Sequence, residues 1–149
     1  FNASAFMFSV GVSPPVVAAA HAALDKLHAE PERVARLHEN GRLFVEAFTS
    51  RGIDIGNTAG FAVGVAMIGD SMRAAKLAER LFARGIATIP VTYPAVAMRA
   101  ARLRFFLTSE HTANQITNAA EVLAEEREAF GPDKFGLSTA SAAIHYVTR

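Results

Sequence analysis

The chain has 149 residues, 51% of them hydrophobic, and a formal net charge of +1 at pH 7. This length is enough for a domain with its own core, and the near-neutral charge gives no basic face of the kind that binds nucleic acid. The absence of cysteine excludes disulfides, thiolate zinc sites and cysteine nucleophiles. The most apolar stretch, residues 10–24, contains two prolines and a histidine and is shorter than the roughly 20 residues of a membrane span. We therefore expect a soluble, cytoplasmic protein.

The first residues already have the character of a strand, and no basic segment typical of a secretory signal precedes them. Residues 6–12 predict a short strand, and a chain that begins in this way suggests a piece of a longer polypeptide. Ser13 follows as a helix N-cap, with Pro14 at the first helical position. The alanine-rich run from there to His28 predicts a helix whose small side chains allow close packing against another element.

A second helix opens at Pro31 and ends at Gly52. Residues 53–55 are predicted as a short strand. Residues 61–68 are predicted as a further strand, in which large side chains alternate with mostly small ones, so that one face is bulky and the other is closely packed. The second helix is amphipathic because apolar or small residues recur at spacings of three and four: Val34, Leu37, Gly41, Phe44 and Phe48.

A third helix begins at the N-cap Asp70 and is stopped by Gly85. Two strands are expected after it, over residues 86–90 and 102–107, and residues 93–96 form a loop between them. These two strands are too close in sequence for a helical crossover, which indicates antiparallel pairing.

The last helix has a capping box made by Thr112 and Gln115, and it ends at Gly131. Residues 132–149 have no convincing period and form a tail of unknown role. The order of elements predicts an α+β fold: a small, mainly antiparallel sheet of three strands covered on one side by helices.

The most informative stretch is Ala-Ala-Arg-Leu-Arg-Phe-Phe-Leu-Thr-Ser-Glu-His-Thr at residues 100–112. Arg102 and Arg104 alternate with Leu103 and therefore lie on the same face of a strand. An arginine among apolar residues is costly to desolvate unless it meets a carboxylate or a phosphate. Two interpretations stay open: one arginine binds a substrate carboxylate in bidentate fashion, or both are surface residues paired with Glu110 or with solvent.

The remaining candidate residues give weaker signals. His21 and His28 are seven residues apart, two helical turns, whereas a metal pair normally has a spacing of four, so we predict no metal site. His111 is expected to act locally at the strand–helix junction. Ser9 ends an apolar strand, where its hydroxyl either binds an anion such as phosphate or bonds to the backbone. No nucleophile or acid–base pair is recognisable, and no catalytic residue is predicted.

Two separated segments resemble signatures of the α-oxoamine synthases, which include 8-amino-7-oxononanoate synthase, glycine C-acetyltransferase, 5-aminolevulinate synthase and serine palmitoyltransferase. Residues 6–15, Phe-Met-Phe-Ser-Val-Gly-Val-Ser-Pro-Pro, are similar to the family pattern Phe-x-Phe-Ser/Thr…Pro-Pro. The second segment comprises Arg84-Gly-Ile, Tyr93-Pro-Ala-Val and residues 101–112, at matching spacing and in the family order.

This resemblance implies a pyridoxal-phosphate enzyme of aminotransferase fold type I. Such an enzyme condenses an amino acid with an acyl thioester, usually acyl-CoA or an acyl carrier thioester, and releases CO2 and an α-amino ketone. Residues 1–30 would be the end of the large domain and its linking helix. Residues 31–131 would be the small C-terminal α+β domain, and residues 132–149 a tail.

The resemblance also implies roles for particular residues. Arg104 matches the family arginine that binds the carboxylate of the amino acid. Ser9 matches the Ser/Thr that reaches the cofactor phosphate of the neighbouring subunit in a homodimer. His111 and Thr112 match positions of structural character, and Arg102 is left with a structural or supporting role.

The lysine that binds the cofactor lies upstream of the first signature in the family and hence before residue 1. Lys26 and Lys76 are in the middle of predicted helices and are not candidates to replace it. Without this lysine the 149 residues alone are predicted to be inactive. Two alternatives remain: an aminotransferase of the same fold, and a non-catalytic interaction domain derived from it that docks through its alanine-rich helix.

Overall fold

The computed structural model describes residues 11–131, and the chain divides into two compact units, Phe1–Ala35 and Arg36–Arg149. The strand predicted over residues 6–12 falls almost wholly outside the described residues, as does the tail after Gly131. The assignment of domains from the sequence therefore remains a prediction.

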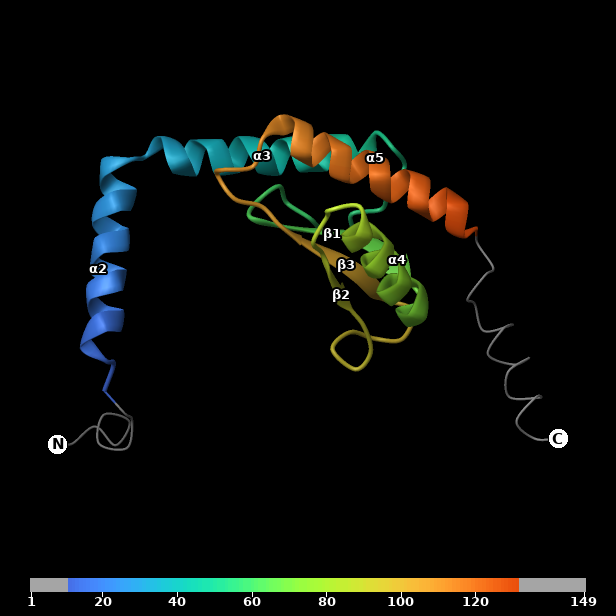
Figure 1. The fold of residues 1–149 in the computed structure, drawn as a ribbon, viewed down its shortest axis with the longest axis horizontal. Coiled ribbons are helices and arrows are strands. Elements are labelled where there is room, and N and C mark those ends of the chain that lie inside the picture. The colour runs from blue at the N-terminus through green and yellow to red at the C-terminus, as the bar shows by residue number, and fades with distance from the viewer. Residues whose placement is uncertain (1–10, 132–149) are drawn as a thin grey trace. The chain divides into compact units, whose positions relative to one another are not determined.

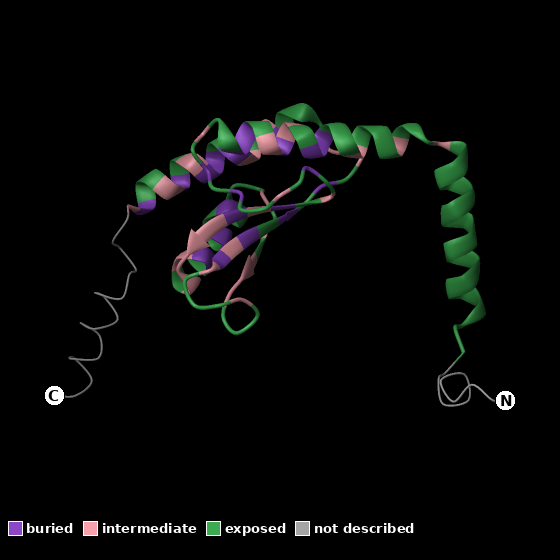
Figure 2. Cartoon of the chain, turned by 180° about the vertical axis from the view of Figure 1, so that it is seen from behind, coloured by how far each residue is buried: buried purple, intermediate pink, exposed green. Residues whose placement is uncertain are grey.

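Helix α2 (Pro14–Ala29) lies within the first unit. Ser13 occupies its N-cap position and proline its first positions, as predicted, although the Ser13 side chain makes no capping hydrogen bond among the described residues. None of the residues of α2 is buried, and Figure 2 shows the helix exposed along its whole length. Its valine and leucine side chains are therefore exposed together with its alanines.

The second unit contains an antiparallel sheet of strands β1 (Val63–Gly69), β2 (Ile89–Val91) and β3 (Ala101–Phe106). Their spatial order within the described residues is β1-β3-β2, so that β3 lies in the centre and pairs with both neighbours. The predicted three-stranded antiparallel sheet is confirmed.

Two predicted strands differ from the structure. Residues 53–55 are not a strand: Asp54 accepts one backbone hydrogen bond, from Met67 at 2.7 Å, before its side chain accepts from the Gly56 N–H and the chain turns. The strand predicted over residues 86–90 is shortened to Ile89–Val91. Ile86 belongs to the end of the preceding helix instead, because its N–H donates to Leu81 O at 2.9 Å in a Schellman-type cap.

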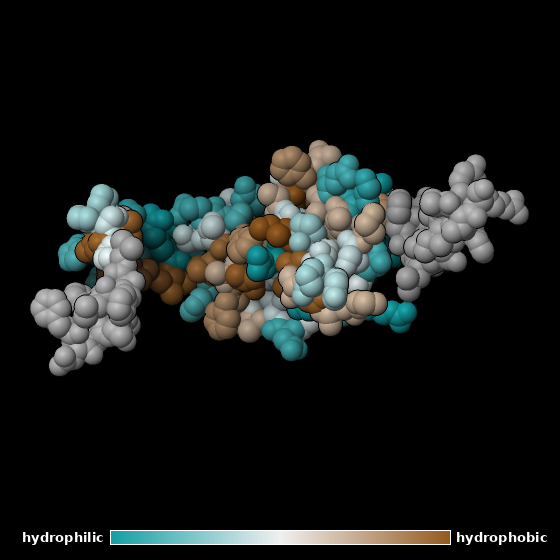
Figure 3. All heavy atoms as spheres, turned by 90° about the horizontal axis from the view of Figure 1, so that it is seen from below, coloured by the Kyte–Doolittle hydropathy of each residue, from teal (hydrophilic) through white to brown (hydrophobic). Residues whose placement is uncertain are grey.

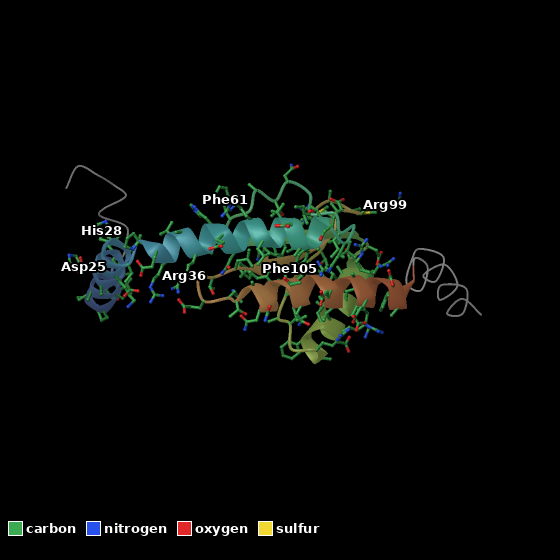
Figure 4. All side chains as sticks on the ribbon, turned by 90° about the horizontal axis from the view of Figure 1, so that it is seen from above. Asp25, His28, Arg36, Phe61, Arg99 and Phe105 are labelled. Carbon is green, nitrogen blue, oxygen red and sulfur yellow. The ribbon has the colours of Figure 1, made fainter. Side chains whose placement is uncertain are left out.

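Helices α3 (Glu32–Thr49), α4 (Ser71–Ala83) and α5 (Ala113–Phe130) pack with the sheet around one core cluster. Figure 1 shows α3 and α5 above the sheet, and Figure 4 shows them side by side with Phe105 between them. The Asp70 carboxylate caps α4 by accepting from the Arg73 N–H at 2.8 Å. The predicted α+β layer is thus confirmed. The largest fully buried side chains are Phe44, Phe48, Leu77, Leu81, Leu103 and Leu123.

Strand β1 presents its small residues to the helices, and this brings α3 close to the sheet. Gly64 and Ala66 are buried, whereas Val63 on the opposite face is exposed. A Cβ atom at Gly64 would lie 2.3 Å from Cε1 of Phe44. The ring of Phe44 is stacked on Phe48 with 3.9 Å between centroids. The face of small residues is therefore closely packed, as predicted.

Glu126 of α5 is a buried carboxylate that joins α5 to α4. It accepts hydrogen bonds from Arg80 and, at 3.4 Å, from Arg84, which also binds Glu125 at 2.6 Å. The hydrogen bond from Arg80 lowers the pKa of Glu126 below its ordinary value of 4.5; burial opposes this shift and Arg84 adds to it. The ionised form of Glu126 therefore stabilises the contact between the two helices.

We expect Gly64→Ala to lower the free energy of unfolding by about 1–3 kcal/mol, the usual cost of overpacking a core. The stacked Phe44 ring cannot withdraw from the added methyl group without disturbing Phe48. Urea unfolding followed by circular dichroism measures the change. Val63→Ala, on the exposed face of the same strand, is the control and should cost less than about 1 kcal/mol. Unchanged stability of Gly64→Ala would contradict this account.

We expect Glu126→Gln to destabilise the protein at neutral pH and to reduce the loss of stability in acid. Because the folded-state pKa is lowered, the contribution of Glu126 is complete above its ordinary pKa of 4.5 and is lost as the pH falls through the folded-state value. Urea unfolding at pH steps from neutral to about pH 3 compares parent and variant. The difference should shrink in acid, and a constant difference would contradict the assignment. Glu128→Gln, exposed on the same helix, is the control.

Candidate carboxylate-binding site

Strand β3 sends alternate side chains to opposite faces of the sheet. Every second residue is buried in the core under the helices. The residues between them lie on the other face, which α3, α4 and α5 leave uncovered, as the view from behind shows (Figure 2). The side chains on this uncovered sheet face are Arg102, Arg104 and Phe106 of β3, with Val63, Val65 and Met67 of β1 and Ile89 and Val91 of β2.

Arg104 lies in the centre of the uncovered sheet face. Its Cα partners in the neighbouring strands are Val65 on β1 and Ile89 on β2, and residues paired in this way have Cβ atoms about 5 Å apart. The guanidinium carbon lies over the ring of Phe106, 5.1 Å from its centroid. Within residues 11–131 the guanidinium has no hydrogen-bond or ion-pair partner. Arg104 is therefore an exposed cation with its N–H donors available and apolar side chains around its stem.

Arg102 is arranged differently, although it shares the face. Its Nε donates to the carbonyl oxygen of Ala100 at 3.1 Å, and the residue is half-buried. Its Cα partners are Met67 and Val91. One donor of Arg102 is thus used to hold its own strand, so Arg104 is the better placed of the two arginines to bind an anion.

The surroundings of Arg104 are largely apolar. Val63, Ile89 and Phe106 are 45%, 46% and 50% exposed. Figure 3 shows hydrophobic residues gathered on the side of the second unit that is seen from below, with hydrophilic residues among them. An ion pair is stronger where apolar groups exclude water than in bulk solvent. This setting favours recognition of a carboxylate once a ligand or a further protein surface covers it.

The loop between β3 and α5 is held by hydrogen bonds within itself. The Thr108 N–H donates to Nδ1 of His111 at 3.0 Å. Thr112 and Gln115 form the capping box that the sequence predicts. The Gln115 N–H donates to the Thr112 hydroxyl oxygen at 3.3 Å, and the Thr112 N–H donates to the side-chain oxygen of Gln115 at 2.9 Å. The predicted local role of His111 is confirmed.

Asn40 of α3 anchors this loop, which sequence reasoning missed. The residue is buried, and its Nδ2 donates to the carbonyl oxygens of Thr108 and His111, both at 2.9 Å. The signal was available: Asn40 is a polar residue within an apolar helical stripe, three residues after Leu37 and four before Phe44. A buried amide requires partners, and here these are in a loop distant in sequence.

The described lysines are engaged at helix surfaces. Lys26 and Lys76 form ion pairs of 2.8 Å with Glu30 and Glu79. Lys76 is a residue of α4 and does not belong to the uncovered sheet face. The described residues of the second unit therefore include no lysine on the face that carries Arg104.

The other predicted candidates lie apart from Arg104 in sequence. His21 is paired with Asp25 on its own helix, with 3.1 Å between Nδ1 and Oδ2, and His28 is on the same helix. In the described part of the chain, no group of three or more His, Asp or Glu residues could hold a metal ion. Ser9 lies outside the described residues, so its role stays a prediction. None of the helices in residues 11–131 has the length and apolar character needed to cross a membrane.

Comparison with known proteins identifies the family of the chain. Residues 2–123 match the family described as aminotransferase class I and II. An 8-amino-7-oxononanoate synthase from Symbiobacterium thermophilum is 33% identical over 120 residues, which are 80% of this chain and 30% of the relative. The structure of 8-amino-7-oxononanoate synthase from Francisella tularensis has a TM-score of 0.69 at 25% identity, covering 80% of this chain and 34% of that one.

A serine palmitoyltransferase from S. paucimobilis with a bound PLP–myriocin aldimine has a TM-score of 0.73 at 26% identity, covering 82% of this chain and 31% of that one. The fold is thus that of part of a pyridoxal-phosphate enzyme of fold type I. The chain belongs to the aminotransferase class I and II family, and its resemblance to the α-oxoamine synthases is confirmed. It spans about a third of the length of the relatives that it matches.

We expect Asn40→Asp to lower the free energy of unfolding by at least about 2 kcal/mol, because a carboxylate cannot donate to two buried carbonyl oxygens. The loop over residues 107–112 should also lose protection in amide hydrogen exchange. Asn118→Asp, the same change at an exposed position on α5, is the control. Normal stability and protection in Asn40→Asp would show that the loop is held by other contacts.

Proposed function

We propose that this chain is the C-terminal portion of a pyridoxal-phosphate-dependent C-acyltransferase. The complete enzyme would condense an amino acid with an acyl thioester, such as acyl-CoA, and release CO2 and an α-amino ketone. The matched relatives named 8-amino-7-oxononanoate synthase and serine palmitoyltransferase support this class of reaction. They differ in their substrates, so the amino acid and the acyl chain stay open.

The main support for the proposal is that the guanidinium of Arg104 is exposed and, within the described residues, unpaired. Its guanidinium has no acidic partner among residues 11–131, and it stands on a face that the three helices leave uncovered. Guanidinium and carboxylate match in bidentate geometry. Arg104 also occupies the position at which the α-oxoamine synthase signature has the arginine that binds the carboxylate of the amino acid.

In this role Arg104 binds and orients the substrate. Two parallel N–H···O bonds to the α-carboxylate fix the direction of the bond between Cα and the carboxyl carbon, which is the bond broken when CO2 leaves. The central strand supports this orientation, because β3 is hydrogen-bonded on both sides. Apolar neighbours such as Val65 and Ile89 would limit competition from water.

The described residues do not by themselves form a cofactor site. Lys26 and Lys76 are ion-paired on helices, and no other lysine lies within residues 11–131. Pyridoxal phosphate acts as an electron sink for carbanion chemistry when bound. We propose that a large domain, corresponding to the remaining two thirds of the relatives, supplies the cofactor lysine, and that Ser9 reaches the cofactor phosphate of a second subunit.

The organisation of the complete enzyme is part of the same proposal. Residues 1–30 would end the large domain and link it to the small domain of residues 31–131. The whole would be a cytoplasmic homodimer. Residues 132–149 are left without a proposed role, and the 149 residues alone are proposed to be inactive.

We expect Arg104→Gln in the complete enzyme to raise the KM for the amino acid roughly 10- to 100-fold, as expected for loss of a charged, bidentate hydrogen bond. The variant should also lose the preference of the enzyme for an amino acid over the amine that lacks its carboxylate. Steady-state kinetics with a panel of common amino acids measures both. Arg42→Gln, exposed on α3, is the control.

An unchanged KM in Arg104→Gln would refute the assignment of Arg104. The alternatives are separated in the same assay. Release of CO2 that requires an acyl thioester supports the acyltransferase. Amino transfer to a 2-oxo acid without a thioester would indicate an aminotransferase, and the absence of both reactions in the complete protein would indicate an interaction domain.

A further inference from the structure

The contact between Arg104 and Phe106 is the feature of the uncovered sheet face that the carboxylate-binding role does not by itself explain. The two residues are i and i+2 on the central strand and therefore point to the same side. The guanidinium carbon of Arg104 lies 5.1 Å from the centroid of the Phe106 ring. This is within the range of about 6 Å in which a cation is attracted to an aromatic face.

A cation–π contact differs from an ion pair in what it leaves available. An acidic partner would occupy the N–H donors of the guanidinium, whereas the aromatic ring occupies none of them in a hydrogen bond. All five donors of Arg104 therefore stay available for a ligand. The side chain is held in place without a competitor for the carboxylate.

Arg104 has little else to hold it. Its Cα partners, Val65 and Ile89, are aliphatic and offer no acceptor. A long side chain that is free to move must be ordered when a ligand binds, and this weakens binding. Restricting the guanidinium beforehand removes part of that cost.

Packing in the hydrophobic core does not explain why residue 106 is a phenylalanine. The neighbouring Phe105 is buried and contacts the rings of Phe44 and Phe48. Phe106 points away from this cluster, is 50% exposed, and lies opposite Val63. Its ring contact in the described residues is with Arg104.

We propose that Phe106 is a positioning residue for Arg104: its ring holds the guanidinium over the uncovered sheet face with the N–H donors free for the substrate carboxylate. This inference rests on the proposed function of Arg104. It adds that the residue two positions after the arginine determines how well the arginine is pre-organised.

The first test uses the 149-residue protein and detects the contact between Arg104 and Phe106 by NMR spectroscopy. The Arg104 Nε–H resonance is assigned by its disappearance in Arg104→Lys, and we expect the ring current of Phe106 to shift it. Phe106→Leu should move this resonance, whereas Phe106→Tyr should keep it close to its original position. Phe82→Leu is the matched control, because Phe82 is 72% exposed on α4. An unmoved resonance in Phe106→Leu overturns the proposal.

The second test is kinetic and uses the complete enzyme with the amino acid that gives the highest turnover in a panel. We expect Phe106→Leu to raise the KM for this amino acid about two- to fivefold, the range of an exposed cation–π contact, with kcat little changed. Phe106→Tyr should restore the KM, and Phe82→Leu should leave it as it was. A fall in kcat without a rise in KM overturns the positioning role.

The two proposals fail in different ways. If Arg104→Gln raises the KM but Phe106→Leu does not, the inference about Phe106 is wrong and the function of Arg104 stands. If Arg104→Gln leaves the KM unchanged, the carboxylate-binding function is wrong. The positioning role of Phe106 is then wrong as well, and a shifted resonance in Phe106→Leu would show only that the two side chains are in contact.

Discussion

The packing of Phe44 on Gly64 is the constraint from which the rest of the arrangement follows. Because residue 64 has no side chain, α3 can bring an aromatic ring against the backbone of β1. This closes one face of the sheet with a core of phenylalanine and leucine. Side chains in a strand point alternately to the two faces of the sheet. When every second residue of β3 is buried in the core, the residues between them must lie on the opposite face. The exposure of Arg104 is therefore a consequence of how the core is packed on the other side.

Two buried polar contacts add precision to this apolar packing. Asn40 ties α3 to the loop that follows β3, and Glu126 ties α5 to α4 through Arg80. Apolar contacts are tolerant of small shifts, whereas a hydrogen bond requires particular distances and angles. The end of β3 is thus fixed by an amide and the helix layer by a carboxylate. A strand held in this way can keep Arg104 in a constant position.

The elements with strong local signals were predictable from the sequence. Asp70 and Thr112 mark helix starts because capping involves residues three positions apart, and alternation places Arg104 on one face of a strand. The failures have two different causes. Ile86 completes the end of α4 through a local hydrogen bond to Leu81, which the hydrophobic pattern of residues 86–90 does not reveal. Asn40, in contrast, finds its partners about 70 residues further along the chain. The contact of Phe106 with Arg104 is local, but alternation alone predicts only a shared face and not which side chains touch.

Under the proposed function, the placement of charged residues separates two tasks that the complete enzyme must combine. Arg104 keeps its donors free, whereas Lys26 and Lys76 are paired with carboxylates on their own helices. Under the proposed function, recognition of the carboxylate is located on this sheet and the covalent chemistry on another part of the polypeptide. The uncovered sheet face then has a second purpose besides presenting Arg104. Its half-exposed apolar residues, Val63 and Ile89 among them, would be desolvated when the remaining part of the active site covers them, and the same step would strengthen the ion pair between Arg104 and its substrate. Binding of substrate and closure of the site would therefore favour each other.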